Sequence, residues 1–132
     1  MSILIIDGQG GGVGRSLVEA FAKRGSLEDV IVLGANSAAT ANMIRGFNVR
    51  GATGENAVVF NCQKADVIVG PIGIIMANAM LGEITPRIAE AVSSSGARII
   101  LVPMTKCHAL VVGVAERKRQ EYIEEAVEAA LR

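Results

Sequence analysis

The chain has 132 residues, equal numbers of basic and acidic residues, and a composition that is about half hydrophobic but only 3% aromatic. This length is typical of one domain, so residues 1–132 are expected to fold as a single unit. Balanced charge gives no field to attract nucleic acid or an anionic membrane surface, which excludes both as expected partners. A core of small and branched aliphatic residues is typical of buried parallel strands.

Cysteine usage points to a reducing compartment. Cys62 and Cys107 have no metal-binding spacing, and no secretory apolar segment precedes them. We therefore expect reduced thiols, a cytoplasmic location and no metal site. The longest uncharged run, between Asp66 and Glu83, is shorter than the ~20 apolar residues of a membrane helix.

Apolar runs alternate with helical patterns along the first half of the chain. ILIID is an apolar run that stops at a glycine turn, and Leu17 and Phe21 then repeat at helical spacing. Asn36 and Ser37 offer an N-cap for the next helix. The expected elements are a strand at 3–7, a helix at 13–25, a strand at 29–34, a helix from Asn36 to about Arg45, and a short edge strand at 46–51.

The second half continues the alternation and ends differently. The expected elements are a helix from Thr53 to about Gln63, a strand at 65–70, a helix or broken helix to Leu81, a helix from Thr85 to about Gly96, strands at 98–103 and 109–114, and a helix from Glu116 onward. The last two strands are separated by too few residues for a parallel crossover, so they are expected to form an antiparallel hairpin. Tyr122, Ile123, Ala126 and Val127 share one face of the final helix.

This order predicts an α/β fold. We expect a Rossmann-like three-layer sandwich, with a mostly parallel sheet, helices on both faces and a C-terminal antiparallel hairpin. Ligands of such sheets bind beyond the carboxyl ends of the strands, which places a candidate site after Asp7, near Gly70 and after Pro103.

The stretch DGQGGGVGRS follows the first expected strand, and five of its ten residues are glycine. The strict dinucleotide spacing fails, but Gly8, Gly12 and Gly14 form G-x-x-x-G-x-G. This spacing resembles the cofactor loop of short-chain dehydrogenases, which implies close approach of the backbone to a pyrophosphate at a helix N-terminus. The resemblance covers the first half of the chain.

Two features of that enzyme family do not carry over. Its catalytic tyrosine is followed four residues later by lysine, whereas Tyr122, the single tyrosine, precedes Ala126 at that spacing. The acidic residue that binds the adenosine ribose is also missing, because the end of the second strand reads GANS. With no carboxylate there to repel a 2′-phosphate, NADP is slightly favoured over NAD.

Other interpretations of the glycine run remain open. Gly14-Arg15-Ser16 is similar to the end of a P-loop, although Arg15 replaces the lysine and Gln9 the first glycine, so an ATP or phosphate binder is one alternative. A non-enzymatic interaction module with a purely structural turn is another. Lys106, Cys107 and His108 lie in the expected hairpin turn and are better explained as an ordinary polar turn, and residues 117–119 as a solvated face.

Longer stretches, including IDGQGGGVGRSLVEA and ADVIVGPIGIIMANAMLGEITP, resemble a family of small bacterial proteins described only as a domain of unknown function. That resemblance implies a Rossmann-like fold but no activity. The residues themselves predict a small NAD(P)-binding protein, a sensor or accessory subunit, acting as a homo-oligomer. The expected cofactor-binding residues are Gly8, Gln9, Gly10, Gly11, Gly12, Val13, Gly14, Asn36, Ser37, Gly70 and Gly73.

Overall fold

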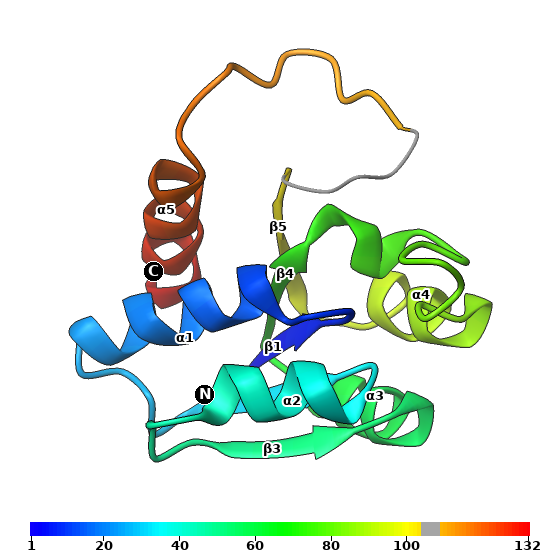
Figure 1. Ribbon diagram of the computed structural model, residues 1–132, viewed down its shortest axis with the longest axis horizontal. Helices are drawn as coiled ribbons and strands as arrows, with labels where there is room; N and C mark the ends of the chain where they lie inside the picture. The colour runs from blue at the N-terminus through cyan, green and yellow to red at the C-terminus, as the bar shows by residue number, and fades with distance from the viewer. Residues whose placement is uncertain (104–108) are drawn as a thin grey trace.

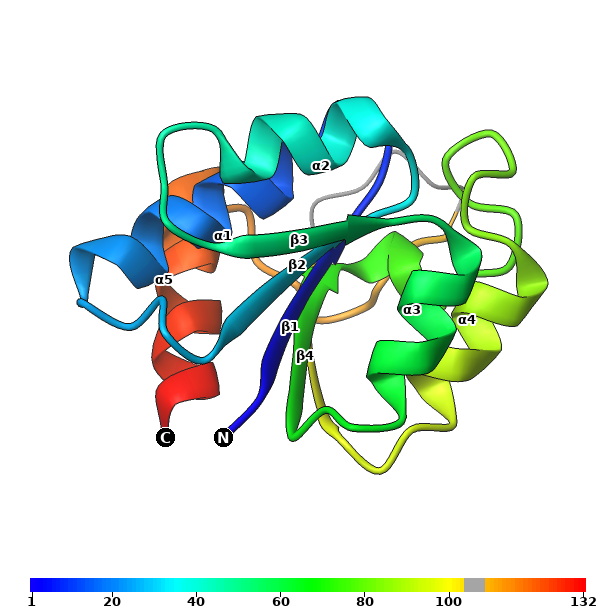
Figure 2. The same cartoon turned by 90° about the horizontal axis from the view of Figure 1, so that it is seen from below.

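A five-stranded sheet forms the centre of the computed structural model, which describes residues 1–103 and 109–132. Its strand order is β3-β2-β1-β4-β5, and every pair is parallel (Figures 1 and 2). The strands are β1 (Ile3–Asp7), β2 (Val30–Gly34), β3 (Arg50–Thr53), β4 (Val67–Pro71) and β5 (Arg98–Val102). The helices are α1 (Gly12–Lys23), α2 (Ser37–Ile44), α3 (Glu55–Cys62), the 3₁₀ turn η1 (Ile72–Ile75), α4 (Pro86–Ser93) and α5 (Arg119–Leu131).

Alternation along the central strands divides the core into two halves. Ile3 and Ile5 of β1 belong to the cluster that includes buried residues of α1, α2 and α5. Leu4 and Ile6 point to the opposite face and pack in the cluster of α3 and α4. Helices therefore cover both faces, as Figure 2 shows, and the arrangement is consistent with the three-layer sandwich expected from the sequence.

The parallel pairing between β1 and β4 spans fewer residues than the pairings of β1 with β2 and of β4 with β5. Their register ends at Ile5 and Val69, while β1 pairs with β2 as far as Asp7 and β4 pairs with β5 as far as Pro71. The chain also reverses its direction of winding between β1 and β4, which makes this the switch point of the sheet. The carboxyl ends of these two strands are thus where a ligand crevice is expected.

The predicted antiparallel hairpin is wrong. Every strand among residues 1–103 and 109–132 is parallel, and residues 109–114 form no strand. Gly113 has a φ of 93°, which interrupts an extended run, and the chain instead arches back towards α5 (Figure 1). Leu110 and Val112 are consequently about nine-tenths exposed. The turn residues Lys106, Cys107 and His108 lie outside the described residues.

Several element boundaries also differ from the prediction. The helix or broken helix expected up to Leu81 is reduced to η1, because Met76 is extended and Asn78, Met80 and Leu81 have positive φ values that a right-handed helix does not accommodate. Strand β3 begins at Arg50 rather than at residue 46, and α5 begins at Arg119 rather than Glu116.

The helix starts expected at Asn36 and Thr85 are confirmed, and the one expected at Thr53 is wrong. The side chains of Asn36 and Thr85 accept hydrogen bonds from the amides of Ala39 and Ile88. Thr53, however, belongs to β3, and Gly54 occupies the N-cap of α3. Across the described ranges, no helix has the length and apolar character that crossing a bilayer requires, and no three metal-ligating side chains come together.

Candidate functional site

The glycine run forms a tight turn between β1 and α1. The amide of Gly11 donates to the carbonyl of Gly8 at 2.9 Å, and Gly11 has a φ of 72°. A Cβ at position 11 would lie 2.8 Å from the carbonyl oxygen of Ala39, so α2 packs directly on the turn. Gly10, in contrast, has open space where a side chain would be. The turn therefore combines glycines required by packing with one that leaves its outer side free.

Asp7 lies beneath this turn and organises it. Its side chain is buried, and the two carboxylate oxygens accept hydrogen bonds from the amides of Gly8 at 2.8 Å and Gly14 at 2.7 Å. The second bond satisfies an amide in the first turn of α1, which has no carbonyl partner within the helix. Desolvation by burial raises the pKa of Asp7, although the two amides and the positive charge of Arg119 oppose the shift.

The raised pKa of Asp7 predicts a pH-dependent contribution to stability. A carboxyl that is harder to ionise in the folded state contributes most below its unfolded pKa of about 3.9, and this contribution is lost as pH rises through the folded pKa. We expect the difference in unfolding free energy between wild type and Asp7→Asn to fall with pH, by at most about 1.4 kcal/mol per pH unit. Denaturant titrations at several pH values measure it, and a difference that rises with pH would contradict the assignment.

Arg119, the first residue of α5, reaches the start of α1. Its Nη2 donates to Ser16 Oγ at 3.1 Å, and lies 3.3 Å from where a Cβ on Gly12 would stand. The first turn of α1 carries no acidic residue, and the amides of Gly12 and Val13 precede the helix's own hydrogen-bond ladder. A guanidinium therefore lies beside the positive end of a helix dipole, an arrangement that favours an anion between them.

Glu83, in the connection between η1 and α4, lies over the same turn. Its Oε1 accepts from the amide of Gln9 at 2.6 Å, and its Oε2 accepts from Asn36 Nδ2 at 2.8 Å. Asn36 Nδ2 also donates to the carbonyl of Gln9 at 2.9 Å. One carboxylate thus joins the loops that follow β1 and β2.

Arg15, the residue at the position of a P-loop lysine, is directed elsewhere. Its Nη1 donates to the carbonyls of Asn42 and Arg45 at the end of α2, and its guanidinium lies 4.8 Å from the centre of the Phe47 ring. These acceptors are the negative end of a helix dipole, which is a favourable position for a cation. The arginine is therefore engaged at α2 rather than at the glycine turn.

The two glycines predicted on the far half of the site are both buried. Gly70 lies in β4, where a Cβ would be 2.4 Å from the carbonyl oxygen of Ile6, and Gly73 lies in η1. Close packing of β4 against β1 explains the glycine at position 70. Ser37, predicted beside the ribose, is exposed at the first residue of α2.

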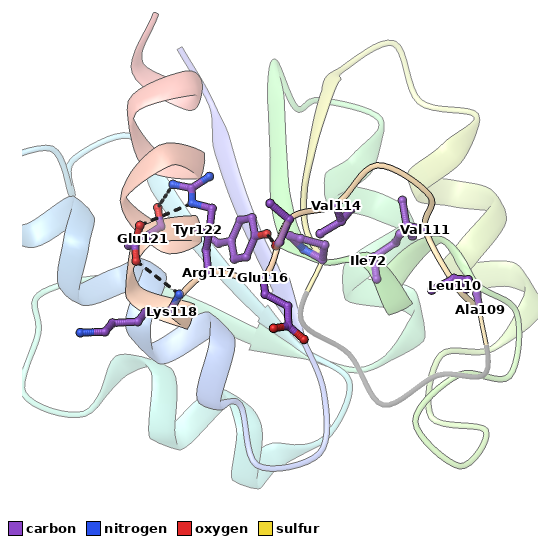
Figure 3. Close-up of a pocket in the computed structure, with 12 residues that line it drawn as sticks. Ile72, Ala109, Leu110, Val111, Val114, Glu116, Arg117, Lys118, Glu121 and Tyr122 are labelled. Carbon is purple, nitrogen blue, oxygen red and sulfur yellow. Dashed lines mark hydrogen bonds and ion pairs between the residues drawn. The ribbon is translucent and has the colours of Figure 1, made fainter.

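A pocket of about 730 Å³ opens beyond the carboxyl ends of β4 and β5. Ile72 and Pro103, which follow these two strands, form part of its wall. Residues 109–111 and 114–118, together with Glu121 and Tyr122 of α5, form the rest. Figure 3 shows Tyr122 between α5 and the arching segment, where its hydroxyl donates to the carbonyl of Ala115. The pocket and the glycine turn are on opposite sides of the switch point.

Sequence reasoning assigns no role to three charged residues of this site. Asp7 marks the end of a strand beside the expected site, Glu83 lies in the region expected near a substrate but in no motif that specifies a reaction, and Arg119 belongs to a run interpreted as a solvated face. The acid at the end of a buried strand was the one local signal. Glu83 lies 74 residues after its partner Gln9, and Arg119 lies 103 residues after its partner Ser16, so no local sequence pattern marks either residue.

A model of a known protein family matches nearly the whole chain. The family model for a domain of unknown function, DUF3842, matches residues 2–132. A search of the curated proteins finds no match. The comparison therefore agrees with the family resemblance drawn from the longer sequence stretches, and it brings no activity or ligand with it.

Proposed function

We propose that this chain, which belongs to the DUF3842 family, binds a dinucleotide of the NAD(P) type at the carboxyl edge of its parallel sheet. In this proposal the chain uses its sheet as dinucleotide-binding Rossmann domains do. The cofactor would lie across the switch point between β1 and β4. The chain would serve as a cofactor-binding sensor or accessory subunit.

The position of Arg119 carries this proposal. A cation beside a helix N-terminus is electrostatically unfavourable unless an anion lies between them. Asp7 offsets part of this positive charge, since its oxygens accept from the amides of Gly8 and Gly14 and its charge acts on Arg119, but it bonds neither the Gly12 nor the Val13 amide. A pyrophosphate against the amides of Gly12 and Val13 would balance both the helix dipole and the guanidinium.

The pocket beyond β4 and β5 favours a dinucleotide over a mononucleotide. A ligand whose phosphates lie at the start of α1 would extend across the switch point into the 730 Å³ pocket beyond β4 and β5. The pocket is lined by apolar residues such as Ile72 and Val114 together with Tyr122 (Figure 3), a mixture suited to a flat polar ring.

The P-loop alternative has less support. A P-loop needs a cation at the position of Arg15 to reach the terminal phosphates, and that side chain is engaged with carbonyls at the end of α2. The interaction-module alternative predicts no nucleotide binding at all, so it is separated from the proposal by the same experiment.

The test is a thermal-shift panel with NAD, NADP, ATP, GTP and coenzyme A. The chain has one tyrosine and no tryptophan, so ultraviolet absorbance reveals any nucleotide that remains after purification. A dinucleotide at 100 times its dissociation constant should stabilise the protein by about 2.7 kcal/mol. Flat curves for nucleotide-free protein would overturn the proposal, and stabilisation by ATP that requires magnesium would favour the P-loop alternative instead.

A further inference from the structure

The sequence lacks an acidic residue where dinucleotide-binding sheets hold the adenosine ribose. That residue ordinarily follows the second strand, about 20 residues after the glycines, and hydrogen-bonds the ribose 2′-hydroxyl. Here the end of β2 is followed by Ala35 and Asn36. The structure nevertheless brings a carboxylate to this place from another part of the chain.

Glu83 provides that carboxylate. Its Oε1 would be 2.7 Å from a Cβ on Gly8, which places it directly over the turn that follows β1. Its Oε2 is bonded to Nδ2 of Asn36, the side chain that follows β2. The amide of Gln9 holds the other oxygen at 2.6 Å, so the carboxylate is fixed by donors from both loops.

We infer that Glu83 selects a ribose with a free 2′-hydroxyl, so that the site takes NAD rather than NADP. This inference rests on the proposed function. A carboxylate offers about four acceptor positions, and the two protein donors leave others for ribose hydroxyls. The same negative charge repels a 2′-phosphate, which carries up to two charges of its own. Asn36 then acts as a positioning residue, since its amide is bonded to the carboxylate.

The preference is the reverse of the one expected from the sequence. NADP is slightly favoured by the sequence because no carboxylate directly follows the second strand, and Glu83 lies 47 residues after Asn36 in the chain. The connection between η1 and α4 supplies the missing charge. The positive φ values of Asn78, Met80 and Leu81 show that this connection turns tightly before it reaches Glu83.

The experiment is calorimetric titration of wild type, Glu83→Gln and Glu90→Gln with NAD and NADP. Glutamine keeps the size of the side chain and one acceptor oxygen but removes the charge. Wild type should bind NAD at least about tenfold more tightly than NADP, and Glu83→Gln should reduce that ratio by a similar factor. Glu90, an exposed residue of α4, is the matched control and should leave the ratio unchanged.

The outcomes separate the two proposals. Wild type that binds NADP as tightly as NAD would overturn the selection by Glu83 and leave the proposed function standing, whereas wild type that binds neither would overturn both. If Glu83→Gln fails to fold, the comparison of 5′-AMP with 2′,5′-ADP on wild type gives the same answer without a variant. Tighter binding of 2′,5′-ADP would contradict the inference.

Discussion

The substitution Gly70→Ala is expected to lower the free energy of unfolding by about 2 kcal/mol or more. The added Cβ would lie 2.4 Å from the carbonyl oxygen of Ile6 and 2.9 Å from Cδ1 of Ile74. Ile74 can adjust its side chain, but the Ile6 carbonyl belongs to the central strand β1. Relieving that contact requires β1 and β4 to separate at the point where their register already ends.

Denaturant unfolding without any nucleotide measures this effect directly. Gly96→Ala is the control, because a Cβ there meets nothing within 4 Å and the residue is exposed. Its unfolding free energy should stay within about 0.5 kcal/mol of wild type. If Gly70→Ala is as stable as this control, close packing does not account for the glycine, and a ligand contact becomes the better explanation.

The substitution Arg119→Ala is expected to weaken dinucleotide binding by about tenfold or more. A guanidinium bonded to a phosphate contributes a charge-assisted hydrogen bond, and such bonds are the stronger class. The free energy of unfolding should change little, because the hydrogen bond from Arg119 to Ser16 is exposed to solvent. The expected result is therefore a large change in affinity with a thermal midpoint close to that of wild type.

Arg24→Ala is the matched control for this experiment. Arg24 lies at the opposite end of α1 from the glycine turn, forms an ion pair with Glu124 at 3.3 Å and does not line the pocket. Its removal should leave the affinity within about twofold, since its charge is already balanced. Arg119→Ala should lose affinity for ADP by the same factor as it loses affinity for NAD. Equal affinities of wild type and Arg119→Ala for these ligands would contradict an anion-binding site at the start of α1.

Most of the sheet was predictable because its signals are local. The apolar runs of β1, β2, β4 and β5 are short and bounded by turns, and the Asn36 and Thr85 caps mark helix starts within a few residues. Residues 109–114 have the same apolar character yet form no strand. Strand formation depends on a partner edge and on backbone angles that Gly113 does not adopt, and neither can be judged from hydropathy.

The candidate site was predictable only on its glycine side. A turn rich in glycine after a buried strand is visible in ten consecutive residues, and the structure places it at the switch point. The charges around it come from β1, from the connection before α4, and from α5. Their meeting depends on the tertiary arrangement of the whole sheet, so Glu83 and Arg119 had no recognisable motif.

The contact between Arg119 and Ser16 also has a consequence for the order of folding. Closing a loop of 103 residues costs more chain entropy than the local contacts that build β1, α1 and β2. The strand, turn and first helix can therefore assemble early, while the arginine joins them only after α5 has docked on α1. During synthesis, the start of α1 therefore stays without this cation until α5 has left the ribosome and docked.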